Sequence, residues 1–149
     1  MTRLDMALAG VSIIGIDTSP FIYYIERHPD HVAVLHEIIR RVDEGLVSAV
    51  TSTITLTEVL TRPKQVGDTR LEEDYRALLS TSRNLSLVPI DAPVADEAAT
   101  LRARHGLRTP DALQVAATLV CGCDAFLTND RGLSGVTELR VLLLDDLEL

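Results

Sequence analysis

Short runs of aliphatic and β-branched residues alternate with helical segments along the chain, and this alternation constrains the fold more than any other feature. The runs cover residues 11–16, 46–50, 85–90, 125–128 and 139–144. Consecutive short, buried strands separated by helices are typical of a parallel sheet with helices on its faces. The sequence therefore predicts an α/β fold.

Capping residues predict where several helices begin and end. Ser19 is expected to cap a short helix after the first strand, and Asp30 to cap the helix that follows it. Ser52 or Thr53 is expected to open a third helix, which Pro63 would close.

Length and charge exclude several classes of protein. A chain of 149 residues suits one domain. Its 14 basic and 22 acidic residues give a net charge of −8, which has no general attraction for phosphate backbones and argues against a simple groove-binding DNA protein. An aromatic content of 3% argues against single-strand binding by base stacking. The acidity fits either a solvated surface or a carboxylate cluster around a divalent metal.

Cysteine and apolar patterns predict a protein of a reducing compartment. Cys121 and Cys123 are too close in sequence for an unstrained disulfide and are interpreted as small buried side chains. The four histidines form no zinc-binding motif with them. The apolar stretch Met6–Ile16 is shorter than the roughly 20 residues that span a bilayer and makes a poor signal peptide. We therefore expect a cytoplasmic protein with no membrane partner.

Four acidic residues fall at positions where a site is expected. Asp17 ends the first strand and Asp130 follows the run 125–128, so both lie at the carboxyl edge of the predicted sheet, where ligands of open α/β sheets bind. Asp111 lies in the first turn of a helix, and Glu58 interrupts an otherwise apolar helix. Each alone also has a structural explanation, as a helix-dipole partner, a turn residue or an exposed side chain.

Carboxylates gathered within a few ångströms repel one another and retain protons unless a cation lies among them. Oxygen-only ligands select Mg²⁺ or Mn²⁺ over zinc. Such a metal polarises a phosphate oxygen and lowers the pKa of bound water. The joint pattern therefore predicts metal-assisted hydrolysis of a phosphodiester by Asp17, Glu58, Asp111 and Asp130.

These residues lie in segments that resemble the PIN domain family, and most closely its VapC-like toxins. The resemblance runs from about Val11 to the end of the chain, in the family's order and spacing. It is carried by four motifs: Ile14–Ile22, Thr55–Leu60, Arg108–Ala117 and Asp124–Leu133.

The resemblance implies a single-domain three-layer α/β/α sandwich with a mostly parallel five-stranded sheet. Residues 1–10 would be an N-terminal extension and residues 11–149 the nuclease domain. The implied activity is that of a Mg²⁺- or Mn²⁺-dependent endoribonuclease acting on RNA. The implied assembly is a homodimer paired with a small antitoxin protein. By position, Asp17 and Asp111 would be the primary metal ligands and Asp130 and Glu58 would complete the shell, with Thr18, Thr128 and Asn129 as supporting polar groups.

Other α/β families lack their required residues here. A haloacid-dehalogenase-like phosphatase needs a second Asp where the chain has Ser19, and a receiver domain needs a Lys near its last strands, whereas the sole lysine is Lys64. A dinucleotide-binding glycine motif is absent. Two readings within the resemblance stay open: a stand-alone RNA-processing nuclease and a catalytically silent binding module. The RNA substrate is also open, with Arg62, Arg108 and Arg131 as candidates for contacting its backbone.

Overall fold

A parallel sheet forms the centre of the molecule, as the alternation of strands and helices predicts. The computed structural model describes residues 1–149. All neighbouring strands pair in parallel, so the sheet is entirely rather than mostly parallel, in the order β3-β2-β1-β4-β5. The strands are β1 (Ile13–Ile16), β2 (Ser48–Ser52), β3 (Leu85–Val88), β4 (Ala125–Thr128) and β5 (Arg140–Leu143).

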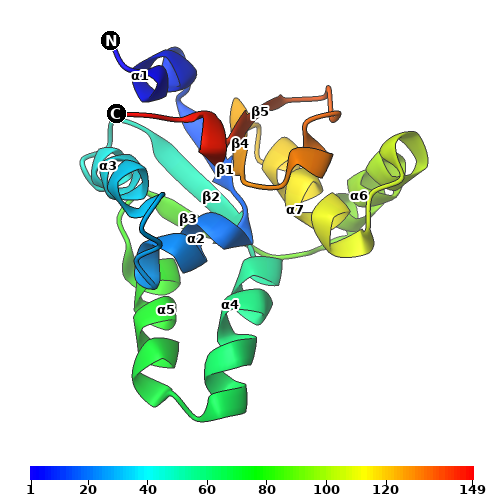
Figure 1. Cartoon of the computed structure of the whole chain (residues 1–149). Helices are drawn as coiled ribbons and strands as arrows, with labels where there is room; N and C mark the ends of the chain where they lie inside the picture. The colour runs from blue at the N-terminus through cyan, green and yellow to red at the C-terminus, as the bar shows by residue number, and fades with distance from the viewer.

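Helices cover both faces of the sheet (Figure 1), which gives the three-layer sandwich. The α-helices are α1 (Arg3–Leu8), α2 (Thr18–Ile25), α3 (Val32–Asp43), α4 (Thr53–Val66), α5 (Thr69–Thr81), α6 (Ala92–His105) and α7 (Thr109–Val120), and the short 3₁₀ helices are η1 (Arg131–Leu133) and η2 (Leu144–Asp146). None of the helices combines the length and the apolar character needed to cross a bilayer. In Figure 1, α4 and α5 extend as a hairpin beyond one edge of the sheet.

Alternating side chains of the strands pack into two separate hydrophobic cores. Ile14 and Ile16 of β1 belong to the core under α2, α3 and α5, together with Ala125 and Leu127 of β4. Phe126, between the latter two, belongs to the core under α6 and α7. This is the period of two expected of a strand buried on both faces.

Helix α7 packs closely against the sheet at Gly15 of β1. A Cβ placed on Gly15 would lie 2.3 Å from Oγ1 and 2.4 Å from Cγ2 of Thr118 on α7. The absence of a side chain at Gly15 therefore lets α7 lie directly on the central strand, which brings the start of α7 to the end of β1.

The chain changes direction across the sheet next to β1. From β1 it proceeds to β2 and β3 on one side, and then returns to form β4 and β5 on the other. Open α/β sheets form their binding crevice at such a switch point, outside the carboxyl ends of the strands. This rule places a ligand at the ends of β1 and β4, which is where Asp17 and Asp130 occur.

Two predicted helix starts are wrong and one is confirmed. The N-cap of α2 is Asp17, whose carboxylate accepts a hydrogen bond from the Thr18 N–H, because the helix begins directly where β1 ends; Ser19 lies inside it. The N-cap of α3 is His31 rather than Asp30, and no side chain bonds the helix end there. Ser52 caps α4 as predicted, accepting from the Ile54 N–H at 3.1 Å.

The predicted end of α4 at Pro63 is also wrong. Pro63 lies within the helix, which continues to Val66. The helix ends at Gly67, whose φ of 70° provides the left-handed conformation that closes it. The C-terminal end of α4 is therefore set by Gly67, four residues after Pro63, and not by the proline.

Residues 1–10 pack on the rest of the molecule. They contain α1, whose Leu4 side chain is fully buried in the core under α2, α3 and α5. Asp5 accepts a hydrogen bond from Arg41 of α3 at 2.6 Å, and the Leu4 N–H donates to the backbone oxygen of Glu148. This segment therefore joins the two ends of the chain, which lie close together in Figure 1.

Candidate functional site

Asp17 is held at the carboxyl edge of the sheet by groups from three elements. Its Oδ2 accepts a hydrogen bond of 2.7 Å from the hydroxyl of Thr128 at the end of β4. Its Oδ1 accepts from the Thr18 N–H of α2 at 2.8 Å and from Gln114 Nε2 of α7 at 3.3 Å. The carboxylate is therefore fixed relative to both central strands and to α7.

The surroundings of Asp17 favour a nearby cation. Burial raises the pKa of the Asp17 carboxyl, and the negative charge of Asp111 adds to this effect against the hydrogen bonds from Thr128 and Thr18, which lower it. A carboxylate that is difficult to keep ionised gains most from a neighbouring positive charge. The contact from Gln114 joins α7 to Asp17, and Asp111 lies on the same helix three positions before Gln114.

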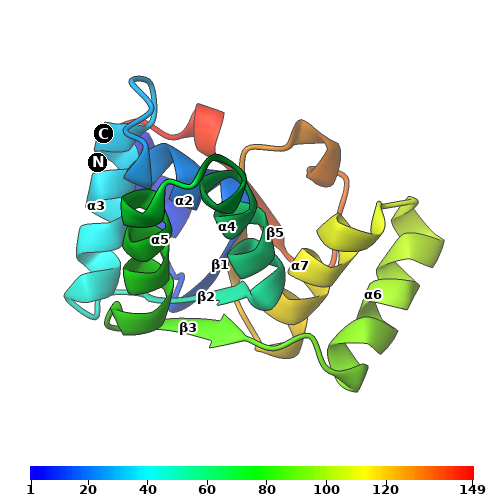
Figure 2. The same ribbon diagram turned by 90° about the horizontal axis from the view of Figure 1, so that it is seen from below.

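Glu58 is joined to the Asp17 region through Thr18. Helix α4 begins where β2 ends, and Glu58 lies on its exposed side. Its Oε1 accepts a hydrogen bond of 2.9 Å from the Thr18 hydroxyl, which is itself buried. Figure 2, which views the molecule from below, places α2, α4 and α7 around this edge of the sheet.

Asp111 lies in the first turn of α7 beside an exposed arginine. Its Oδ2 accepts a hydrogen bond of 3.2 Å from Nε of Arg108, whose side chain is 79% exposed. An ion pair with such an exposed partner contributes little to stability and is readily exchanged. Asp111 is thus available to another cation.

The segment after β4 carries the remaining candidates. The Asp130 N–H donates to the Thr128 hydroxyl at 3.1 Å, while Asp130 Oδ1 accepts from the Gly132 N–H and caps η1. Asn129 Oδ1 accepts from the backbone N–H of Asp145 in η2 at 3.2 Å. Thr128 therefore contacts Asp17 directly, whereas the side chains of Asn129 and Asp130 bond to the segments that follow β4.

The structure joins Asp17, Thr18, Glu58 and Thr128 in one hydrogen-bonded network and places Asp111 nearby. No three His, Cys, Asp or Glu side chains lie at the spacing of a metal-binding group. The chemistry of the donor set nevertheless fits Mg²⁺ or Mn²⁺, because all four candidate ligands are carboxylates and these ions prefer oxygen.

The cysteines lie outside this site and are free thiols. Cys121 is exposed and Cys123 is partly buried, so the prediction that both are buried is wrong. Both follow the end of α7, where the chain turns toward β4, and burial raises the pKa of each thiol. Neutral thiols of this kind are poor metal ligands.

Buried polar residues beneath the acids were missed by the sequence analysis. Gln114 of α7 is 3% exposed, and its Nε2 lies 2.8 Å from Thr55 Oγ1 and 3.0 Å from Thr18 Oγ1. Its Oε1 accepts from the Ser52 hydroxyl. The available signal was a single polar residue within the apolar run 112–117, the same signal that singled out Glu58.

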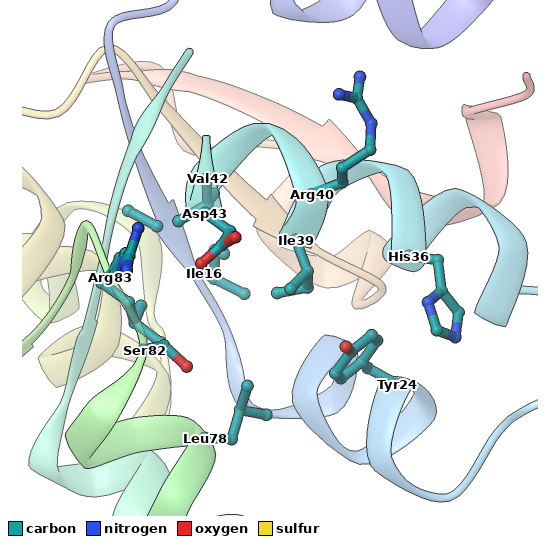
Figure 3. Close-up of a pocket in the computed structure, with 12 residues that line it drawn as sticks. Ile16, Tyr24, His36, Ile39, Arg40, Val42, Asp43, Leu78, Ser82 and Arg83 are labelled. Atoms are coloured by element: carbon teal, nitrogen blue, oxygen red, sulfur yellow. The ribbon is translucent and has the colours of Figure 1, made fainter. Parts of the chain in front are cut away.

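A separate cavity of about 360 Å³ lies between α2, α3 and α5 (Figure 3). Its lining combines apolar side chains such as Ile39 and Leu78 with Tyr24, His36 and Arg83. None of the four candidate acids lines it, although Ile16, which precedes Asp17, does. The cavity therefore belongs to the helical face of the molecule rather than to the acidic edge.

Comparison with known proteins gives a family and a set of similar folds. The family model of the PIN domain matches residues 14–139. No curated protein sequence matches the chain.

Among solved structures, a chain of VapBC2 from Rickettsia felis, bound to a DNA fragment from its promoter, has a TM-score of 0.72 at 16% identity over 88% of this chain and 98% of that one. A chain of DNA-bound VapBC from Salmonella typhimurium has a TM-score of 0.70 at 18% identity, over 89% and 98% of the two chains. The sarcin-ricin loop cleaving toxin VapC20 of Mycobacterium tuberculosis has a TM-score of 0.63 at 20% identity, over 85% and 98%.

Proposed function

The chain belongs to the PIN domain family, and on this premise we propose that it is a divalent-metal-dependent endoribonuclease, the toxin of a toxin–antitoxin pair. The observation that carries the proposal is the placement of Asp17 at the switch point of the sheet, where Thr128, Thr18 and Gln114 hold its carboxylate. Burial and the negative charge of Asp111 raise the pKa of that carboxyl, which favours a bound cation. We assign the nuclease domain to residues 11–149 and treat residues 1–10 as an extension packed on it.

We assign Asp17 and Asp111 as the primary metal ligands, with Glu58 and Asp130 completing the shell and Thr18, Thr128 and Asn129 in supporting roles. Bound Mg²⁺ or Mn²⁺ would polarise a phosphate oxygen and lower the pKa of a water molecule. The Thr128 hydroxyl and the Thr18 N–H keep Asp17 in one orientation. The Thr18 hydroxyl holds Glu58 Oε1, which leaves Oε2 available as a ligand, directly or through a water molecule.

The partners of the proposed toxin follow from its chemistry and its similar structures. The substrate is RNA, so we place the protein in the cytoplasm. The similar chains include components of toxin–antitoxin complexes, which supports a small antitoxin partner, and we further infer a homodimer from the family resemblance. Co-purification of the neighbouring gene product and light scattering of the isolated chain test these two assignments; a nuclease without such a partner would instead be a stand-alone RNA-processing enzyme.

Charge-neutral substitutions test the activity. Asp17→Asn and Asp111→Asn should each abolish cleavage of cellular RNA while the protein stays folded, because each removes a ligand charge from the site. Asp124→Asn is the matched control: Asp124 precedes β4 and its carboxylate accepts from the Ser12 and Ile13 N–H groups at the opposite edge of the sheet. Full activity in both site variants would refute the assignment and favour a binding module without turnover. Sequencing the 5′ ends of the cleaved RNA identifies the substrate.

A further inference from the structure

Gln114 is the most highly connected buried polar side chain beneath the acidic site. Its amide contacts four side chains from four elements: Asp17 at the end of β1, Thr18 on α2, Thr55 on α4 and Ser52 at the end of β2. The molecule has no buried side-chain nitrogen or oxygen without a hydrogen-bond partner. The direction of each bond in this network can therefore be worked out from the number of hydrogens available.

The hydroxyl hydrogens of the network are committed away from Gln114. Thr51 donates its single hydrogen to the backbone oxygen of Ile16 at 2.7 Å. The contact of 2.7 Å between the Thr51 and Thr55 hydroxyls must then be donated by Thr55. Thr18 donates its single hydrogen to Oε1 of Glu58 at 2.9 Å. The hydroxyls of Thr18 and Thr55 also lie 3.2 Å apart, but with both hydrogens committed elsewhere neither donates across that contact. Toward Gln114, both Thr18 and Thr55 can only accept.

The amide nitrogen of Gln114 supplies the hydrogens that these two threonines lack. Its two hydrogens match the shorter contacts, 2.8 Å to Thr55 and 3.0 Å to Thr18, with Asp17 Oδ1 at 3.3 Å sharing the second. Its oxygen accepts from Ser52. A flipped amide would place its oxygen against two hydroxyl oxygens that have no hydrogen to offer, so only one orientation satisfies the network.

We propose that Gln114 is a positioning residue of the acidic site, which fixes the Thr18 hydroxyl so that it donates to Glu58 and holds Asp17 Oδ1 toward α7. The proposal rests on the proposed function, since it gives Gln114 a role in orienting metal ligands. Asp111 precedes Gln114 by three positions and so lies on the same face of α7. One helix therefore carries a ligand and the group that orients two others.

Direct metal binding to the purified variants tests the proposal. Gln114→Met keeps the length of the side chain and removes its donors and acceptor. Mn²⁺ binding, followed by the electron paramagnetic resonance of free Mn²⁺, should weaken by about 10–100-fold, the range found when hydrogen-bond partners of metal ligands are removed. Val115→Ala is the matched control, because Val115 is fully buried on the same helix but packs in the core under α6 and α7. Its Mn²⁺ affinity should equal that of the wild type.

Thr18→Val provides a second route if Gln114→Met does not fold. It interrupts the link from Gln114 to Glu58 and should weaken Mn²⁺ binding in the same direction. In the double variant the losses should not multiply, because both changes cut one connection. Wild-type Mn²⁺ affinity in folded Gln114→Met or in Thr18→Val would overturn the positioning role. An equal loss of Mn²⁺ affinity in Val115→Ala would also overturn it, because that substitution leaves the network untouched.

The proposed function fails separately. If the wild-type protein and Val115→Ala neither bind Mn²⁺ nor cleave RNA, the acidic site is not a metal site and Gln114 has no ligands to orient. If both bind and cleave, and Gln114→Met binds equally well, the nuclease assignment stands and only the role of Gln114 is wrong. Cleavage of RNA at saturating Mn²⁺ then measures whether any remaining defect lies in turnover rather than in binding.

Discussion

Gly15→Ala should weaken both the fold and the proposed activity, although it adds only one methyl group. The new Cβ would lie 2.3 Å and 2.4 Å from the two γ atoms of Thr118, whereas ordinary contacts begin at 3.4 Å. Turning the Thr118 side chain does not relieve the clash, because both γ positions are too close and its Cβ itself lies at 2.9 Å. Helix α7 would therefore have to move away from β1 by about 1 Å.

Displacement of α7 should lower both the stability of the fold and the rate of RNA cleavage. Overpacking a well-packed core costs about 1–3 kcal/mol, which corresponds to a fall of several degrees in Tm for a domain of this size. Displacement of α7 also carries Asp111 and Gln114 away from Asp17, and a misplacement of about 1 Å in an active site can cost on the order of 100-fold in rate. We expect Gly15→Ala to lower RNA cleavage by about that factor in protein that is fully folded.

Urea denaturation and single-turnover RNA cleavage measure the two effects. Gly135→Ala is the matched control, because a Cβ there meets nothing within 4 Å and the backbone is not left-handed. Thr118→Ala removes the two closest atoms and should restore part of the stability and activity when combined with Gly15→Ala. Simple addition of the two single effects in the double variant would mean that α7 and β1 are not in close contact at this point, and would refute the reasoning.

Three further outcomes are expected. RNA cleavage should require Mg²⁺ or Mn²⁺ and stop in excess EDTA; cleavage that persists in EDTA would contradict the metal site. In a thermal melt, Mg²⁺ at 100 times its Kd should stabilise the protein by about 2.7 kcal/mol. Leu4→Ala should cost about 2–5 kcal/mol in urea denaturation, because Leu4 is fully buried in the core; an unchanged midpoint would show that α1 is detached in solution. Hydrogen bonds from the Ile13 and Ser12 N–H groups lower the pKa of Asp124, so Asp124 stabilises the fold above its unfolded pKa of about 3.9. The stability difference between wild type and Asp124→Asn should therefore shrink as pH falls below that value. A constant difference from pH 6 to pH 3 would contradict the stabilising role of Asp124.

The three central strands, β1, β2 and β4, could be predicted because most of their residues are buried. A run such as Ala125–Thr128 has no alternative environment in a domain of this size, and its predicted limits agree with β4. Helix boundaries depend on competition between neighbouring groups instead. Ser19 is a good capping residue in isolation. Asp17 caps α2 instead, because the helix begins directly after β1 and the Asp17 carboxylate lies next to the Thr18 N–H.

The candidate acids could be predicted from their positions at strand ends, whereas the network beneath them could not. A strand end specifies where a side chain emerges, so Asp17 is expected at the carboxyl edge. The contacts of Gln114 depend on how α4 and α7 cross the sheet, and Ser52 and Thr55 are 62 and 59 positions away from it in the chain. Only three-dimensional structure brings such separated polar groups together.

The central position of β1 determines when during synthesis the acidic site can form. Asp17 leaves the ribosome early, but the Thr128 hydroxyl that holds it lies 111 positions later, and β1 stays unpaired on that side until β4 docks. Chains grow at about 5–20 residues per second, so the first strand waits several seconds for its second neighbour. A nascent chain that ends before β4 lacks both the strand that pairs with β1 on that side and the Thr128 hydroxyl. The hydrogen bond that fixes Asp17 can therefore form only after the ribosome has translated β4.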